Sequence, residues 1–186
     1  MTSIRKITWV ITGMLFVIAS VAIHYQVKMG MGHRRSGSVR ELGNIKVGQP
    51  APEFSLKDLS DQPVALSSFR DRKVVVLDFW ATWCGPCRMA MPDLQELHDK
   101  FKDDGLEILS VNQGESAEQV RHFIEHKKYS FHVVLDPDTA VGDQYGVRGI
   151  PTLVVMNKRG VVQRIQVGYS ANGDELRKLI ERLTKE

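Results

Sequence analysis

Two cysteines separated by two residues are the feature of this sequence with the clearest chemistry. They stand in Trp83-Cys84-Gly85-Pro86-Cys87, and the chain contains no other cysteine. Two thiols at this spacing can form a reversible dithiol/disulfide couple. One alternative is a structural disulfide closing a very small loop. Another is a zinc site, which needs further ligands, typically a second such pair or paired histidines. The spacing therefore predicts redox chemistry at this pair.

The residues around the cysteines predict a strand, a tight turn and a helix. Residues 73–80 form an apolar run of the length of a buried strand. Gly85 permits a tight turn, and Pro86 suits the first turn of a helix. Cys84 would then lie at a helix N-terminus, where free N–H groups and the helix dipole favour a thiolate. This predicts that Cys84 is the exposed, low-pKa nucleophile and that Cys87 resolves the mixed disulfide.

Strands and helices alternate along the rest of the chain. A second buried strand, 106–112, follows the helix, so the two strands should be parallel with a right-handed crossover. The other predicted strands are 64–66, 133–135, 153–156 and 161–167, and the predicted helices are 86–103, 139–145, 174–183 and one beginning at Ser116. The pattern indicates an α/β fold with a central mixed sheet flanked by helices.

Five segments together resemble the thioredoxin fold and, within it, the membrane-anchored thiol-disulfide oxidoreductases of the TlpA/ResA type. These segments are 47–54, 78–87, 111–116, 134–136 and 146–152. The resemblance covers residues 47–186, and it implies a thioredoxin-like domain with the TlpA/ResA-type βα insert at 115–145. It also implies that the activity is thiol-disulfide exchange.

The resemblance implies a substrate-binding surface beside the dithiol. Pro151 is expected to form a cis peptide bond with Ile150 and to face the cysteines. In this family the backbone next to that proline pairs with an extended substrate segment. A proline that merely begins a strand is the alternative. The residues predicted to contact substrate are Trp83, Gly85, Pro86, Ile150 and Pro151.

Asp78 interrupts the apolar strand six positions before Cys84, where thioredoxin carries a buried acid beneath the dithiol. Burial raises the pKa of a carboxyl group. Asp78 could therefore accept the proton of Cys87 and activate it for resolution. The alternative is a hydrated aspartate at a sheet edge.

One position departs from the family pattern. ResA-like proteins often carry a glutamate three residues after the second cysteine, where this chain has Ala90. That glutamate is associated with apocytochrome c as the substrate. Its absence weakens the inference, from the resemblance, that apocytochrome c is a substrate of this protein. The Gly85-Pro86 dipeptide is that of thioredoxin and favours a reduction potential near about −270 mV rather than about −120 mV.

The N-terminal part of the chain has the composition of a membrane anchor. Residues 7–27 contain no Asp, Glu, Lys or Arg, and as a helix they would span roughly 31 Å, about the thickness of a hydrocarbon core. A cleaved signal peptide is the alternative. The predicted organisation is a basic flank at 1–6, a transmembrane signal anchor at 7–27, a flexible linker at 28–46 and the domain at 47–186.

Charge excludes nucleic acid as a partner. The net charge is +3, but residues 1–46 hold seven of the 25 Lys and Arg residues and only one of the 22 acidic residues. The domain itself is mildly acidic, which does not fit a nucleic-acid footprint. More basic residues follow the apolar stretch than precede it. That bias alone would retain the domain in the cytoplasm, although long domains translocate largely regardless of charge.

These observations predict a membrane-tethered, extracytoplasmic thiol-disulfide reductase of the bacterial cytoplasmic membrane, with its domain in the periplasm. The expected partners are protein disulfides, including those of apocytochrome c, and a transmembrane thiol-disulfide electron donor. No organic cofactor and no metal are expected. A net oxidase or isomerase, a weaker peroxidase interpretation, and a non-catalytic peptide-binding module are the alternatives.

Overall fold

A computed structural model describes residues 37–170 and 173–186, and these residues belong to one compact unit. The predicted flank at 1–6 and the predicted anchor at 7–27 lie outside the described residues. In the part of the chain that is described, no helix is long and apolar enough to cross a membrane.

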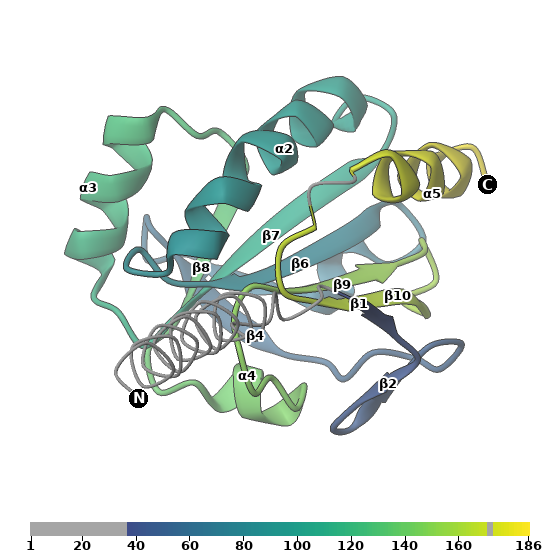
Figure 1. The fold of residues 1–186 in the computed structure, drawn as a ribbon, viewed down its shortest axis with the longest axis horizontal. Coiled ribbons are helices and arrows are strands. Elements are labelled where there is room, and N and C mark those ends of the chain that lie inside the picture. The colour runs from purple at the N-terminus through teal and green to yellow at the C-terminus, as the bar shows by residue number, and fades with distance from the viewer. Residues whose placement is uncertain (1–36, 171–172) are drawn as a thin grey trace, which may run out of the picture. The chain divides into compact units, whose positions relative to one another are not determined.

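The domain is organised around an eight-stranded mixed sheet with the strand order β1-β10-β9-β6-β7-β8-β4-β5 (Figure 1). Its strands are β1 (Gly37–Val39), β4 (Ser55–Asp58), β5 (Pro63–Ala65), β6 (Val74–Trp80), β7 (Leu106–Gln113), β8 (His132–Asp136), β9 (Thr152–Met156) and β10 (Val162–Val167). β6, β7 and β8 are parallel, and the other pairs are antiparallel. The predicted central mixed sheet is confirmed, with β6 in its interior.

Helices cover both faces of the sheet (Figure 1). They are α2 (Gly85–Phe101), α3 (Ala117–Lys127), α4 (Ala140–Gln144) and α5 (Asp174–Thr184), with a short 3₁₀ helix η1 (Leu66–Phe69). Buried side chains of α2, α3 and α5 form one core cluster with alternate residues of β6, whereas α4 and η1 pack on the opposite face. Because β6 is covered on both faces, all seven of its residues are buried.

The predicted linker is partly wrong, because residues 37–46 belong to the domain. β1 pairs with β10 at the edge of the sheet, and a small hairpin follows, formed by β2 (Glu41–Leu42) and β3 (Ile45–Lys46). Ile45 is 1% exposed and packs in the core. Gly43 turns the hairpin with φ +52°, and a Cβ there would lie 2.4 Å from the Cα of Gly146. This close approach requires glycine at position 43, which lies within the predicted linker.

A histidine between two carboxylates makes the stability of the sheet depend on pH. His132 on β8 has Nδ1 3.3 Å from Glu107 and Nε2 3.8 Å from Asp58, on the two neighbouring strands. The hydrogen bond to Glu107, helped by the charge of both carboxylates, raises the pKa of His132. The stabilisation is therefore complete below about pH 6.5, the ordinary pKa of histidine, and is lost as the pH rises through the raised value.

We expect His132→Gln to lower the free energy of unfolding by up to about 1 kcal/mol at pH 5.5, because a third of the side chain is exposed and solvent screens the pair. At pH 8.5 the same substitution should have little effect. Urea unfolding at the two pH values measures both. His126→Gln, at an exposed position on α3, is the control, and an equal loss at both pH values would contradict the assignment.

Candidate active site

The two cysteines form a disulfide at the N-terminus of α2, with their Cα atoms 5.3 Å apart. Cys84 is the N-cap residue of the helix, and its Sγ accepts a hydrogen bond from the backbone N–H of Cys87 at 3.2 Å. Pro86 stands in the first helical turn, where a backbone N–H has no partner within the helix. The predicted position of Cys84 at a helix N-terminus is confirmed. In the reduced protein, the N–H groups of this turn can stabilise its thiolate.

Both cysteines are shielded from solvent in the disulfide form. Cys84 is 4% exposed and Cys87 is 1% exposed. The prediction of an exposed Cys84 is therefore wrong for this form, because the first turn of α2 packs into the core on that face of the sheet. Cys84 is still the more accessible of the two, so an incoming thiolate reaches it first.

Asp78 lies on the same face of β6 as α2. Its strand neighbours Val76 and Trp80 belong to the core cluster that contains both cysteines. Asp78 is 2% exposed, so the alternative of a hydrated aspartate at a sheet edge is excluded. Burial raises the pKa of this carboxyl to about 7, although a hydrogen bond from Ser110 opposes the shift.

The Asp78 carboxyl has one partner and one free oxygen. Ser110, directly opposite on β7, donates its hydroxyl proton to Oδ2 at 3.2 Å. Oδ1 is buried without a hydrogen-bond partner among the described residues. With a pKa near neutrality and an unused acceptor, Asp78 is suited to take up and release a proton at physiological pH. No sequence pattern singles out Ser110, whose role follows from strand register.

A second buried carboxylate, which sequence reasoning did not single out, contacts the loop before the cysteines. Glu115 is 9% exposed and follows β7. Its oxygens accept hydrogen bonds from the Thr82 backbone N–H (2.7 Å), the Thr82 hydroxyl (2.5 Å) and the side-chain amide of Asn112 (2.7 Å). The contact links positions 33 residues apart, so no local pattern could have revealed it.

Pro151 lies at the end of the sheet from which the active-site loop leaves. Thr152 pairs with Phe79 near the carboxyl end of β6, which places Pro151 close to the start of that loop. The predicted cis bond between Ile150 and Pro151 is present. Pro151 itself is buried, whereas Ile150 is partly exposed.

The remaining predicted substrate contacts surround the dithiol on the surface. Trp83 is 70% exposed, Pro86 is exposed and Gly85 is partly exposed. Trp80, the last residue of β6, is fully buried and packs against the ring of Phe123 at a centroid distance of 5.4 Å. Of these two tryptophans, Trp83 is the one available to a substrate.

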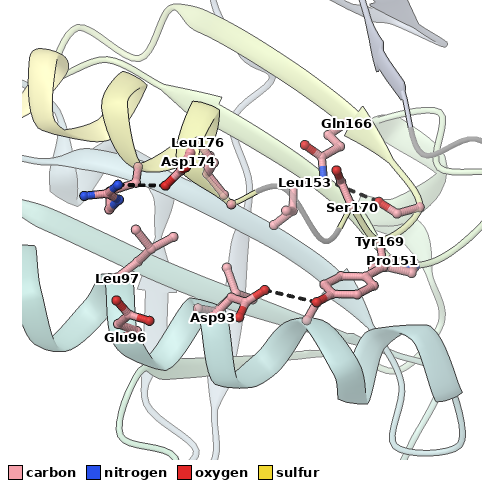
Figure 2. Close-up of a pocket in the computed structure, with 15 residues that line it drawn as sticks. Asp93, Glu96, Leu97, Pro151, Leu153, Gln166, Tyr169, Ser170, Asp174 and Leu176 are labelled. Atoms are coloured by element: carbon pink, nitrogen blue, oxygen red, sulfur yellow. Dashed lines mark hydrogen bonds and ion pairs between the residues drawn. The ribbon is translucent and has the colours of Figure 1, made fainter.

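A groove of about 270 Å³ begins at Pro151 and runs between α2 and α5 (Figure 2). Ala90 lines it on the α2 side, together with Leu94 and Leu97, so the position where ResA-like proteins often carry a glutamate opens into this groove. Tyr169 reaches across to α2 and donates a hydrogen bond to Asp93 at 3.3 Å (Figure 2).

No metal site accompanies the dithiol within residues 37–170 and 173–186. No group of three or more His, Cys, Asp or Glu side chains there could hold a metal ion. The rings of His122 and His126 lie 6.5 Å apart on α3. The groups that the structure places at the site are two sulfurs, a buried carboxyl group and backbone N–H groups.

Sequence comparison agrees with this geometry. The sequence profile of the AhpC/TSA family matches residues 47–165. Thiol-disulfide oxidoreductase ResA of Halalkalibacterium halodurans is 33% identical over 164 residues, which cover 88% of each chain. ResA of Bacillus subtilis is 38% identical over 125 residues, which cover 67% of this chain and 69% of that protein.

Solved structures with the same fold are also proteins of disulfide exchange. A protein of Chlorobium tepidum provisionally named thiol:disulfide interchange protein DsbE matches with a TM-score of 0.67 and 32% identity, over 73% of this chain and 96% of that one. A thiol:disulfide interchange protein of a Bacteroides species matches with a TM-score of 0.66 and 27% identity, over 77% and 93%.

Proposed function

Because the chain belongs to the AhpC/TSA family and, within it, to the thiol-disulfide oxidoreductases of the ResA and DsbE type, we propose that it reduces protein disulfides outside the cytoplasm while tethered to the membrane. The observation that carries the proposal is a dithiol at a helix N-terminus, on the same face of the sheet as a carboxyl group with a pKa near neutrality. This arrangement supplies both a nucleophile and a proton acceptor, and the couple needs no bound cofactor.

The reaction proceeds in two steps. The Cys84 thiolate attacks one sulfur of the client disulfide, forms a mixed disulfide and releases the other client sulfur, which takes up a proton. Cys87 then passes its proton to Asp78 and attacks Cys84. The second client sulfur leaves as a thiolate and takes up the proton that Asp78 returns, and the Cys84–Cys87 disulfide forms. The client gains two electrons and the enzyme loses two, so a thiol donor must reduce the enzyme again.

The proposed client is a protein with its disulfide in an extended segment. Such a segment would pair with the backbone beside Pro151, as in other β-augmentation complexes, and continue into the groove between α2 and α5. Apocytochrome c is one such client. Ala90 leaves that part of the groove without the carboxylate that ResA-like proteins often place there, which favours a broader set of clients.

The direction of electron flow follows from the reduction potential of the couple. We expect a value near about −250 mV, because Gly85-Pro86 is the dipeptide of thioredoxin, which lies at about −270 mV. Equilibration of the purified domain in dithiothreitol redox buffers, read by thiol alkylation and mass spectrometry, measures it. A value near about −120 mV would make the protein a net oxidase and contradict the proposal.

The tether is proposed from residues 7–27, which are apolar and free of charge over the length of a membrane span. The electron donor would then be a transmembrane thiol-disulfide carrier on the same side of the membrane. A reporter fused after residue 35 and active only in the periplasm would support this localisation. A reporter active only in the cytoplasm would contradict it, and release of the fusion into the soluble periplasmic fraction would indicate a cleaved signal peptide.

A further inference from the structure

We propose that Glu115 is a positioning residue for the dithiol: its buried carboxylate fixes the turn that carries the attacking sulfur. The inference rests on thiol-disulfide exchange at Cys84 and is independent of whether the protein acts as a reductase or an oxidase. Glu115 does not touch the sulfurs, so it acts through Thr82, with which it shares two hydrogen bonds.

The turn between β6 and α2 is anchored at its two ends, where Ala81 and Cys84 are buried in the core cluster. It is closed by one backbone hydrogen bond, from the N–H of Cys84 to the carbonyl of Ala81 at 3.1 Å. Thr82 and Trp83 occupy its middle positions, and Trp83 is 70% exposed. The middle of the turn is held by Thr82, whose backbone N–H and hydroxyl both donate hydrogen bonds to Glu115.

Glu115 is itself held by elements that do not belong to the active-site loop. Asn112, fully buried on β7, donates its side-chain amide to the carboxylate. Gly114, with φ +73°, donates its backbone N–H to Asp136 at 3.0 Å. Ser116 on the other side is the N-cap residue of α3, with its capping box formed. The carboxylate is therefore a fixed point to which the turn is attached.

The position of the turn matters for reactivity because Cys84 is the N-cap residue. Its sulfur accepts a hydrogen bond from the N–H of Cys87, and that interaction favours the thiolate only while the sulfur stays over the helix end. A Thr82 that is no longer fastened lets Cys84 move away from the N–H groups, which disfavours the thiolate and the attack on a client disulfide.

Substitution by glutamine separates position from charge. The amide oxygen can accept from the Thr82 N–H and from Asn112, as Oε2 does now, while the amide nitrogen donates to the Thr82 hydroxyl, which can rotate to accept. Glu115→Gln therefore keeps the three hydrogen bonds and removes the charge. Glu115→Ala removes the charge and all three hydrogen bonds.

The test is the pH profile of Cys84 alkylation by iodoacetamide in the reduced full-length protein. We expect Glu115→Ala to raise the midpoint of the profile and to lower the rate at pH 7 about tenfold. Glu115→Gln should restore most of that rate, and Thr82→Val, which loses only the hydroxyl contact, should fall between wild type and Glu115→Ala. Glu118→Ala, at an exposed position on α3 three residues away, is the matched control.

Three outcomes would count against the proposal. If Glu115→Ala lowers the melting temperature but leaves the midpoint unchanged, Glu115 has only a structural role. If Glu115→Gln is as impaired as Glu115→Ala, charge and not position is the cause. Thr82→Val gives a result even if Glu115→Ala does not fold, and an unchanged midpoint there would count against the proposal. Because iodoacetamide reports on the sulfur without a client, these results do not depend on the direction of electron flow.

Discussion

Replacing Cys84 by serine is expected to abolish disulfide exchange, whereas replacing Cys87 by serine should trap the first intermediate. Cys84 is the N-cap of α2 and the more exposed of the two cysteines, so its thiolate makes the first attack. A serine hydroxyl cannot form a disulfide, so Cys84→Ser should lower the rate by about 10³-fold or more, to the uncatalysed background. In the Cys87→Ser variant, Cys84 can still attack the client disulfide, but no second thiol can resolve the mixed disulfide, which should therefore accumulate.

The measurement is reduction of a fluorescent peptide disulfide, with non-reducing gels and mass spectrometry to detect the trapped adduct. Because the chain has no other cysteine, no third thiol can take over the missing step in either variant. Full reduction of the peptide by both variants would mean that the exchange does not pass through these cysteines and would contradict the proposed enzyme. An adduct on Cys87 in the Cys84→Ser variant, and none in Cys87→Ser, would reverse the two roles.

The redox pair, and the strand and helix that carry it, could be predicted from the sequence because they depend on residues close together in the chain. A short stretch of sequence contains all the signals: the apolar run that ends at Trp80, the Gly-Pro dipeptide after Cys84, and the helix that follows. The parallel pairing of β6 and β7 then followed from the helix between them. The identity of the site therefore needed little information from distant parts of the chain.

The features that sequence reasoning missed depend on contacts across long sequence separations. Gly43 lies within the predicted linker, whereas in the fold it turns a hairpin that closely approaches Gly146, about one hundred residues later. Glu115 reaches Thr82 across 33 residues. The burial of Cys84 arises from the packing of α2 on the sheet. In each case the neighbours exist only once the sheet is assembled.

Asp78 is expected to raise the rate of mixed-disulfide resolution and to lower the free energy of unfolding. The substitution Asp78→Asn should reveal both effects, each in its own measurement. Its carboxyl is buried with a pKa of about 7, against about 3.9 for an exposed aspartate. Folding therefore favours the protonated form. Below about pH 4 the group is protonated in both the folded and the unfolded protein, and its ionisation costs the fold nothing. As the pH rises toward 7 the unfolded state gains stability by ionising, and above 7 the penalty is constant.

We therefore expect the oxidised wild-type protein to lose roughly 2–3 kcal/mol of stability between pH 5 and pH 8 through this group, and Asp78→Asn to lack that loss. Urea unfolding across the range measures it, and the pH dependence is informative even if the asparagine adds a constant offset. Parallel curves for the two proteins would show that Asp78 does not titrate near neutrality in the fold.

The same substitution should slow resolution of the mixed disulfide about 100-fold, because Cys87 loses its proton acceptor. It should also remove the inflection near pH 7 from the rate profile, measured by rapid mixing of a preformed mixed disulfide. Ser110→Ala is the matched variant: it keeps the carboxyl but removes the hydrogen bond that lowers its pKa. The inflection should then move to higher pH and remain present. If Asp78→Asn changes stability but leaves the rate profile intact, water or another group takes the proton, and the carboxyl serves no step of the exchange.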